Sequence, residues 1–424
     1  IEKEFSAKSK LIMFKQILTT IFLFSLTSAQ LFAQVYGCTD PLATNYDFTA
    51  TNNDGGCTYS AAAVTPVISY SLDGSLSETS GLISWNDRVW THNDNTDTNL
   101  YSLDTLSGAI LQTFPISGVV NYDWEEISQD SNYVYMGDFG NNVNGNRTDL
   151  KILRIEKSSI LSGSPLVDTI FFSYVDQTDF TPTGGNNTDF DCEAMIVSVD
   201  SIYLFTKQWV SNRTVVYSLP KLPGTYSAIR KSELDVQGMI TGATYKESNR
   251  LITLCGYTNL LQPFIYLLYD FNANDFFSGN KRKLNLSLSF HQVEGIASND
   301  GLKYYCSNEA FVQAPFINTP QKLHVLDLSS YLDNYLNQII LSASQEAIPQ
   351  IALYPNPANE FIILENVLYG SKGNYLIVDL SGRIVERGIL NEGKQKVNVS
   401  NLSPGIYFVA ISGSTSQNLR MIKQ

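Results

Sequence analysis

The feature that most constrains the fold is an internal repetition within residues 64–340. Five segments of roughly fifty residues share one layout: a strand that opens with a short motif, a second strand that ends in polar residues, and a third, regular strand. The five opening motifs are Ser80–Ile83, Trp124–Ile127, Cys192–Met195, Thr241–Thr244 and Val293–Ile296. Units of this kind predict a β-propeller, because each unit can bury its apolar face only against its neighbours.

Five blades are expected, with six as the alternative. The last unit reaches four strands only if Val67–Leu72 returns from the N-terminal side, and that return would pair the ends of the repeat region and remove an exposed strand edge. A β-sandwich could hold the same strands, but not the same five-fold layout. The composition agrees with an all-β chain, since 24 Tyr and 22 Phe occur among 424 residues.

The N-terminal residues predict a targeting segment. Residues 13–34 are interpreted as a signal peptide, because Lys15 precedes an apolar stretch, Ile17–Leu26, that is too short to span a bilayer. Residues 1–12 are interpreted as an upstream, non-native segment. Elsewhere in the sequence no stretch is long and apolar enough to predict a transmembrane helix.

Residues 35–60 form a short module rich in Asp and Asn. Cys38 and Cys57 bracket a polar loop and are expected to pair, whereas the other cysteines are expected to be buried thiols: Cys192, Cys255 and Cys306. The module resembles a small disulfide repeat of secreted proteins, Gly-Cys-x-Asp-x-x-Ala-x-Asn-Tyr followed by Asp-Asp-Gly-Ser-Cys. The oxygen-bearing side chains are Asp40, Asn45, Asp47 and Asp54. They suit Ca²⁺, but a disulfide-closed spacer with Asx turns is the favoured interpretation.

The C-terminal residues carry the most specific signal. After a linker, 341–350, short alternating strands and Pro- or Gly-containing turns predict a small antiparallel β-sandwich over residues 351–424. Leu353–Asn359, Val378–Val385, Leu402–Val409 and the ending Met421–Gln424 resemble the sorting domain of type IX secretion cargo. This resemblance implies recognition by an outer-membrane translocon and delivery to the cell surface or the extracellular space, usually with removal of the tail.

The repeat region has a second resemblance, to secreted propellers grouped with phytase-like and esterase-like proteins. The motifs that carry it are Ser77–Leu82, Trp90–Asp94, Asp123–Glu125, Gly137–Asn141 with Arg147, Asp191–Glu193 and Glu294–Ile296. The fourth unit departs from the pattern, since Thr241-Gly242 carries no acid. The resemblance implies an architecture rather than an activity, because propellers host many functions.

Equivalent positions in successive blades form a ring, and here the ring is acidic. Glu125, Glu193 and Glu294 occupy the opening motifs. The second strands end in Asp94, Asp138, Lys207 and Glu309. Converging carboxylates cannot all stay ionised without compensation. Three outcomes are open: Ca²⁺ binds them, Lys207 and Arg147 pair with them, or some of them have raised pKa values. We hypothesise one Ca²⁺ site, and the alternative is a salt-bridged ring that only fixes blade packing.

Two classes of function fit these features. The first is a surface or secreted binding protein that holds a glycan, a polymer or a protein, with Ca²⁺ at the acidic mouth. The second is a Ca²⁺-dependent hydrolase of the phytase, lactonase or esterase kind, with Glu125 or His92 as candidate base. The binding protein is favoured, because the fourth unit lacks the acid and because few basic residues are available at the mouth to hold the polyphosphate substrate of a phytase. The net charge of −13 argues against nucleic acid as a partner.

Overall fold

The computed structural model describes residues 34–343, 351–366, 373–379, 383–391, 393–413 and 417–424. It divides into two compact units, of which the first ends at Leu336 and the second runs from Asn337 to Gln424. The predicted upstream segment, nearly all of the signal peptide and most of the linker lie outside the described residues. Nearly all regular structure in both units consists of β-strands, as the composition predicted.

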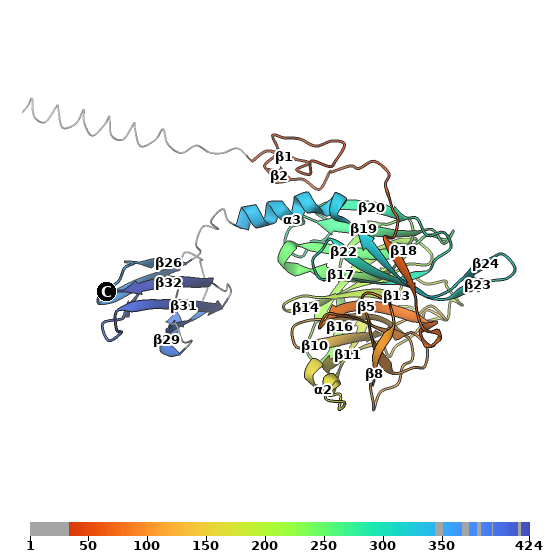
Figure 1. Cartoon of the computed structure of the whole chain (residues 1–424), viewed down its shortest axis with the longest axis horizontal. Coiled ribbons are helices and arrows are strands. Elements are labelled where there is room, and N and C mark those ends of the chain that lie inside the picture. The colour runs from red at the N-terminus through yellow and green to blue at the C-terminus, as the bar shows by residue number, and fades with distance from the viewer. Residues whose placement is uncertain (1–33, 344–350, 367–372, 380–382, 392, 414–416) are drawn as a thin grey trace, which may run out of the picture. The chain divides into compact units, whose positions relative to one another are not determined.

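The first unit is built around five groups of four strands (Figure 1). Group 1 contains β5 (Thr79–Trp85), β6 (Arg88–Asn93), β7 (Asn99–Leu103) and β8 (Ile110–Pro115). Group 2 contains β9 (Trp124–Gln129), β10 (Tyr133–Asp138), β11 (Lys151–Glu156) and β12 (Val167–Tyr174). Group 3 contains β13 (Asp191–Val197), β14 (Ser201–Lys207), β15 (Arg213–Pro220) and β16 (Gly224–Asp235). Group 4 contains β17 (Met239–Lys246), β18 (Leu251–Tyr257), β19 (Pro263–Tyr269) and β20 (Asn280–Leu286). Group 5 contains β21 (Val293–Ser298), β22 (Lys303–Asn308), β25 (Lys322–Asp327) and β4 (Ile68–Ser71).

The first strands of the groups pack against one another in a closed ring, which is propeller-like. β5 lies against β9, β9 against β13, β13 against β17, β17 against β21, and β21 against β5. Within each group the strands are antiparallel neighbours. Groups 2 and 3 are also joined at their outer edges, because β12 pairs in parallel with β16.

Group 5 takes its outer strand from the N-terminal side, as predicted. Ser69 of β4 pairs with His324 of β25, and Ile68 pairs with Val325. A second short strand, β3 (Ala63–Val64), pairs in parallel with β20 at the outer edge of group 4. The chain segment before group 1 therefore covers two strand edges that would otherwise be free to pair with another chain.

A separate apolar cluster fills each interface between neighbouring groups. Between groups 5 and 1, for example, Ala297 and Leu323 pack with Leu82 and Leu103. Equivalent clusters join groups 1 and 2, 2 and 3, 3 and 4, and 4 and 5. Each buried Leu or Ile contributes about 1.5–3 kcal/mol relative to an exposed one. The apolar face of each group is thus buried only by its neighbours, which is why the repeated pattern predicts a ring.

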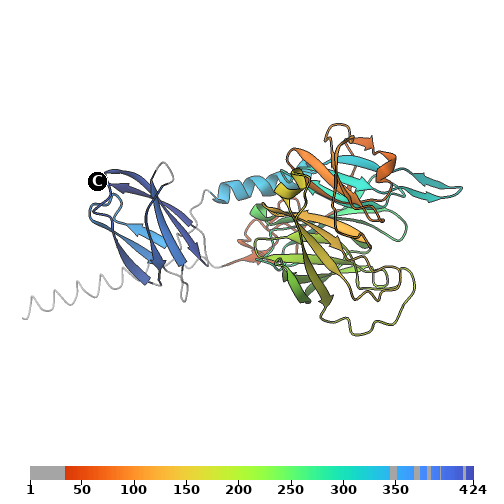
Figure 2. The same ribbon diagram turned by 90° about the horizontal axis from the view of Figure 1, so that it is seen from below.

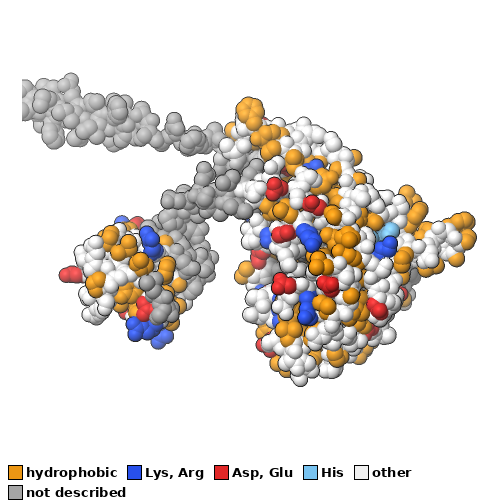
Figure 3. Space-filling model, viewed as in Figure 1, with side chains coloured by type: hydrophobic (Ala, Val, Ile, Leu, Met, Phe, Trp, Pro, Cys, Tyr) orange, Lys and Arg blue, Asp and Glu red, His pale blue; other side chains and the backbone are white. Residues whose placement is uncertain are grey.

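Several short elements lie outside the five strand groups. They are η1 (Gly74–Leu76), α2 (Lys157–Leu161), η2 (Glu247–Asn249) and the hairpin β23 (Phe311–Gln313) with β24 (Ile317–Thr319). The hairpin projects from group 5 in both ribbon views (Figures 1 and 2) and presents an apolar surface (Figure 3). Val312 is 66% exposed and Phe316 is 91% exposed.

The helix α3 (Ser329–Ala343) was not predicted and overlaps the start of the predicted linker. Leu332 and Leu336 lie four residues apart, so they share one helix face, and both are buried in the cluster between groups 4 and 5. Tyr335 Oη donates to the carbonyl of Asn249 at 2.7 Å. Leu332, Tyr335, Leu336, Ile339 and Ile340 recur at helical spacing, so the periodicity of this segment could have predicted the helix. In the described residues, no helix is long and apolar enough to cross a membrane.

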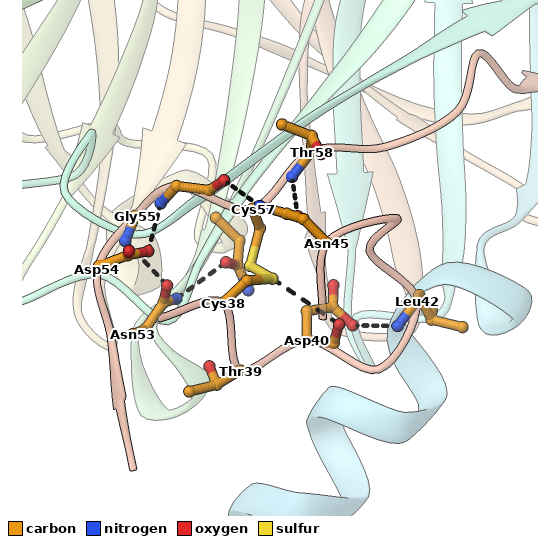
Figure 4. Close-up of a disulfide and its surroundings, with 12 residues drawn as sticks. Cys38, Thr39, Asp40, Leu42, Asn45, Asn53, Asp54, Gly55, Cys57 and Thr58 are labelled. Atoms are coloured by element: carbon orange, nitrogen blue, oxygen red, sulfur yellow. Dashed lines mark hydrogen bonds between the residues drawn. A yellow bond between two sulfur atoms is a disulfide. The ribbon is translucent and has the colours of Figure 1, made fainter. Parts of the chain in front are cut away.

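The N-terminal module contains the predicted Cys38–Cys57 disulfide (Figure 4). Its strands β1 (Tyr36–Gly37) and β2 (Asn52–Asn53) pair in parallel. The oxygen-bearing side chains accept backbone N–H groups at 2.8–2.9 Å: Asp40 from Leu42, Asn45 from Thr58, Asp47 from Thr49 and Asp54 from Gly56. These bonds agree with a disulfide-closed spacer built on Asx turns. The other three cysteines are buried and free.

The second unit contains two antiparallel sheets. One is formed by β26 (Ile351–Tyr354), β27 (Phe361–Asn366) and β30 (Gly393–Asn398), and the other by β29 (Ile384–Leu390), β28 (Gly373–Asp379), β31 (Gly405–Gly413) and β32 (Gln417–Lys423). Ile362 and Val397 of the first sheet pack in one cluster with Ile377 and Val409 of the second. The alternation of apolar and polar residues along these strands explains why one face of each sheet is buried.

Candidate functional site

Every first strand carries a register irregularity at its start, and this places the predicted acids. In four groups, one residue of the first strand has no direct partner on the second strand. These residues are Glu125 in group 2, Glu193 in group 3, Thr241 in group 4 and Glu294 in group 5. In group 1 the irregularity covers Ser80 and Gly81. A β-bulge re-aims the side chain of its extra residue. Three carboxyls thereby occupy equivalent positions, and Thr241 takes the fourth.

The second strands end beside these bulges, because each pairs antiparallel with its first strand. The residues at or directly after those ends are Asp94, Asp138, Lys207, Tyr257 and Glu309. We call this end of the ring the mouth. Glu125, Glu193 and Glu294 are at most 6% exposed, whereas Asp94 and Glu309 are partly exposed.

Lys207 is the central cation of the mouth. Its Nζ forms an ion pair with Glu193 and donates to Tyr257 Oη at 3.1 Å. The same Nζ lies 4.6 Å from the ring centre of Trp209, whose Nε1 donates to Asp191 at 2.7 Å. Burial opposes the charge on Lys207, but Glu193, Tyr257 and other acids outweigh it and raise its pKa. Lys207 therefore remains charged inside the protein.

Asp138 has its own partners. It forms ion pairs with Arg147 Nη2 at 2.9 Å and with Lys151 Nζ at 2.8 Å. Arg147 also donates to the carbonyl of Gly140 at 2.8 Å. A methyl group on Gly140 would lie 2.2 Å from Asp123 Oδ2 and 2.4 Å from Glu125 Oε1. Only glycine leaves room here for two carboxyls to approach the chain.

A second set of carboxyls lies at the outer part of the mouth. One oxygen of each of Glu78, Asp94 and Glu309 lies within 4.8 Å of the other two. The backbone holds these residues together, since Asp94 N donates to the carbonyl of Glu78 at 3.0 Å. Burial and the neighbouring carboxylates raise the pKa of Asp94 to about 7 and that of Glu309 to about 8. Glu78 was not among the predicted site residues, although it lies in the motif that precedes β5.

Acids outnumber bases at the mouth. Once Asp138 is paired, the cations of the described residues that face the remaining carboxyls are Lys207 and, beside Asp123, Arg147. These carboxyls are Glu78, Asp94, Asp123, Glu125, Asp191, Glu193, Glu294 and Glu309. Burial is the largest cause that raises the pKa of Asp123 to about 6 and the pKa of Glu125 well above its usual value, and neighbouring acids add to it. The Oε2 atom of Glu294 is buried and, within the described residues, has no hydrogen-bond partner. Such a set of oxygens can hold a divalent cation or retain protons.

His92, one of the two candidate bases, lies away from this set. Its ring is fully buried and packs edge-on against Trp124 at 6.0 Å between ring centres. Burial lowers its pKa to about 4, and Nδ1 contacts the carbonyl of Asn93 at 3.1 Å. His92 lies within β6, whereas Asp94 follows the end of that strand at Asn93. The alternation that places residues two apart on one strand face therefore does not extend to this pair.

Sequence reasoning missed Glu126, the residue after the bulged Glu125. Its side chain is fully buried, and it accepts from Ile127 N at 2.9 Å and from Ala243 N at 2.8 Å. Ala243 belongs to β17, two groups away around the ring. A methyl group on Gly81 would lie 2.3 Å from Glu126 Oε1. The Glu126 side chain therefore reaches across the centre of the ring, next to Gly81. The sequence signal that could have identified Glu126 is the pair of consecutive acids in this opening motif.

Replacing Glu126 with alanine is expected to lower the free energy of unfolding of the first unit by about 2–4 kcal/mol, because a cavity and unpaired N–H groups remain. Tryptophan fluorescence during urea unfolding measures this, since all four Trp residues belong to the first unit. Glu233→Ala is the control, because its ion pairs with Arg213 and Arg230 are exposed and worth little. Equal stability of the two variants would contradict a central role for Glu126.

Comparison with known proteins identifies the C-terminal unit. Residues 352–424 match the family model described as the secretion system C-terminal sorting domain. No curated protein matches the sequence of the chain.

Solved structures resemble the chain only weakly. PorZ, a surface component of the type IX secretion system of Porphyromonas gingivalis, has 14% identity and a TM-score of 0.28 over 82% of this chain and 45% of PorZ. The chain thus spans less than half of PorZ. The WD40 repeats of RRP9 have 9% identity and a TM-score of 0.34 over 63% of this chain and all of that chain. A chain of a mitotic checkpoint complex has 10% identity and a TM-score of 0.33, over 63% of this chain and 97% of its own.

These scores carry no argument about fold or function, so the sorting domain is what identifies the protein. Such a domain implies interaction with the secretion machinery. The protein carries a type IX sorting domain at its C-terminus and is exported to the cell surface or the extracellular space.

Proposed function

We propose that this exported protein is a five-bladed β-propeller that binds Ca²⁺ at its acidic mouth and, with it, an extracellular glycan, polymer or protein. The five strand groups are the blades, closed by β4 on β25. We also propose that the two sheets of the C-terminal unit form a β-sandwich that the outer-membrane translocon recognises. After export, the propeller is the part that meets the extracellular ligand.

The observation that carries the proposal is the excess of carboxyls over cations at the mouth. Glu78, Asp94 and Glu309 converge within 4.8 Å, and Glu294 keeps a buried oxygen that no described residue partners. Ca²⁺ takes six to eight oxygen ligands, several of them carboxylates. The cation would neutralise acids that Lys207 and Arg147 do not balance, and a partly filled coordination shell would accept oxygens of a ligand.

The test is metal analysis of the purified chain, with thermal unfolding followed by tryptophan fluorescence with and without EGTA. We expect stoichiometric calcium and a drop of several degrees in Tm with EGTA, because a cation that binds only the folded state stabilises it by mass action. Two double variants separate the outer from the inner carboxyls: Glu78→Gln with Glu309→Gln, and Glu193→Gln with Glu294→Gln.

Asp87→Asn is the matched control, because it makes the same carboxyl-to-amide change at an exposed turn between β5 and β6. Loss of calcium from either double variant but not from the control supports the site. Calcium that is retained in both double variants, or absent from the wild type, overturns it.

A Ca²⁺-dependent hydrolase is the second candidate. The pKa values of about 7 for Asp94 and about 8 for Glu309 favour it, because a group that titrates near the working pH is an effective general acid or base. A screen of phosphoesters, lactones and acyl esters with calcium present tests it. Turnover that Glu309→Gln removes supports the hydrolase. No turnover by the calcium-loaded protein rejects it and leaves the binding function standing.

A further inference from the structure

A polar groove lies between the N-terminal module and group 4. It has a volume of about 490 Å³, within the range of ligand sites in proteins. The module contributes Tyr36 and Asn52, and group 4 contributes Arg250, Asp270 and Asn272. Arg250 precedes β18, whereas Tyr257 at the other end of β18 belongs to the mouth. The groove and the mouth are therefore at opposite ends of group 4.

Both walls of the groove are held in place. Asp40 Oδ2 accepts from Tyr59 Oη at 2.8 Å and from Tyr269 Oη at 2.5 Å. Asn53 Nδ2 donates to Asp270 Oδ2 at 3.0 Å and to Asn280 Oδ1 at 2.9 Å. The Cys38–Cys57 disulfide cross-links the module that carries Asp40 and Asn53 (Figure 4). A groove with fixed walls binds its ligand without the entropic cost of ordering them.

The lining keeps hydrogen-bonding capacity that the protein does not use. The side-chain amides of Asn52 and Asn272 make no hydrogen bond to another described residue. Arg250 donates to the carbonyl of Phe271 at 2.9 Å and to Asp270 Oδ1 at 3.0 Å, which leaves part of its five N–H groups free. The Tyr36 side chain is 64% exposed and offers an aromatic face. Free amides, a guanidinium group and an aromatic ring thus face one space.

The charges and the shape of this lining select among ligand classes. Arg250 is neutralised by Asp270, so the groove offers no free charge for a phosphate or a carboxylate. One carboxylate is too few for a cation site. Large aliphatic side chains are absent from the described lining, which disfavours an apolar ligand. A sugar fits, because its hydroxyls both donate and accept hydrogen bonds and its CH face packs on an aromatic ring.

We propose that this groove, formed by Tyr36, Asn52, Arg250, Asp270 and Asn272, binds a neutral polysaccharide. The site lies away from the Ca²⁺ site proposed at the mouth and does not need it. It gives the N-terminal module a function besides spacing, because the module supplies one wall of the groove. The ligand is an extracellular glycan, which an exported protein can meet.

Affinity electrophoresis of the full chain through gels containing a β-1,3-glucan, a β-1,4-mannan or a β-1,4-xylan tests the proposal. We expect at least one polysaccharide to slow the wild type, with or without EGTA. Tyr36→Ala and Asn272→Ala should each weaken this binding by about tenfold or more, as loss of one stacking or hydrogen-bond contact predicts. Tyr46→Ala is the matched control, since Tyr46 is an exposed tyrosine of the same module that does not line the groove.

Two results would overturn the site: no retardation of the wild type by any of these polysaccharides, or equal binding by the two groove variants and the control. Loss of binding in EGTA would also count against it, because it would move the glycan to the mouth. An unchanged Tm of each variant shows that the fold is intact. Asn272→Asp, which keeps the size of the side chain, replaces Asn272→Ala if that variant fails this check.

Discussion

Replacing Lys207 with alanine is expected to lower the free energy of unfolding of the first unit by about 3–5 kcal/mol. Lys207 and its ion-pair partner Glu193 are 3% and 2% exposed, so removal of the cation leaves buried acids without their compensating charge. The mouth holds more carboxyls than cations already, which makes the loss larger than for an isolated pair. Urea unfolding followed by tryptophan fluorescence measures the change in the unit that contains every Trp.

Two variants decide whether the charge is the cause. Lys231→Ala, an exposed lysine of group 3, should change the free energy of unfolding by less than about 0.5 kcal/mol. Adding Glu193→Gln to Lys207→Ala should recover a large part of the loss, because the unpaired carboxylate is then gone. If the single Lys207 variant is as stable as the Lys231 variant, the ion pair does not hold the mouth together.

The second large effect is a fall in stability as the pH rises in the presence of EGTA. Folding raises the pKa of Asp123 to about 6, of Asp94 to about 7 and of Glu309 to about 8, from ordinary values of 3.8 for Asp and 4.5 for Glu. The folded state then binds more protons than the unfolded state at intermediate pH. The stability from these groups is fully present below about pH 4 and is lost as the pH rises through about 6 to 8.

Tm measured by tryptophan fluorescence between about pH 5 and about pH 9 checks this sign. We expect Tm in EGTA to fall across the range and calcium to restore more of it at the alkaline end, where the carboxylates are ionised. Glu309→Gln should flatten the profile, and Asp87→Asn should not. A Tm that rises with pH, or a calcium effect that is larger at acid pH, would contradict the assignment of raised pKa values to the mouth.

Much of the architecture could be predicted from local pattern. The repeated strand layout predicted the strand groups and the return of β4 to β25, because burial of one face per group demands neighbours and a closed edge. The turns and motifs after residue 350 predicted the sorting domain. Glu125, Glu193 and Glu294 could be found as a set because they repeat at one position of the opening motif.

The rest of the site depends on contacts between residues far apart in the chain. Glu78 joins Asp94 and Glu309 only after β21 has packed against β5. Glu126 meets Ala243, 117 positions away, across the centre of the ring. Likewise, the groove exists because Asn53 bonds to Asp270, 217 positions further on.

The sequence by itself determined the strand groups, the closing strand, the disulfide and the sorting domain, since each follows from local periodicity, turn chemistry or a short motif. Only the tertiary structure decided which carboxyls share the mouth, that His92 is buried away from them, and that the N-terminal module forms a groove with group 4. The physical reason is that the pKa of a carboxyl and the direction of a side chain depend on neighbours brought by the ring, and sequence spacing does not encode those neighbours.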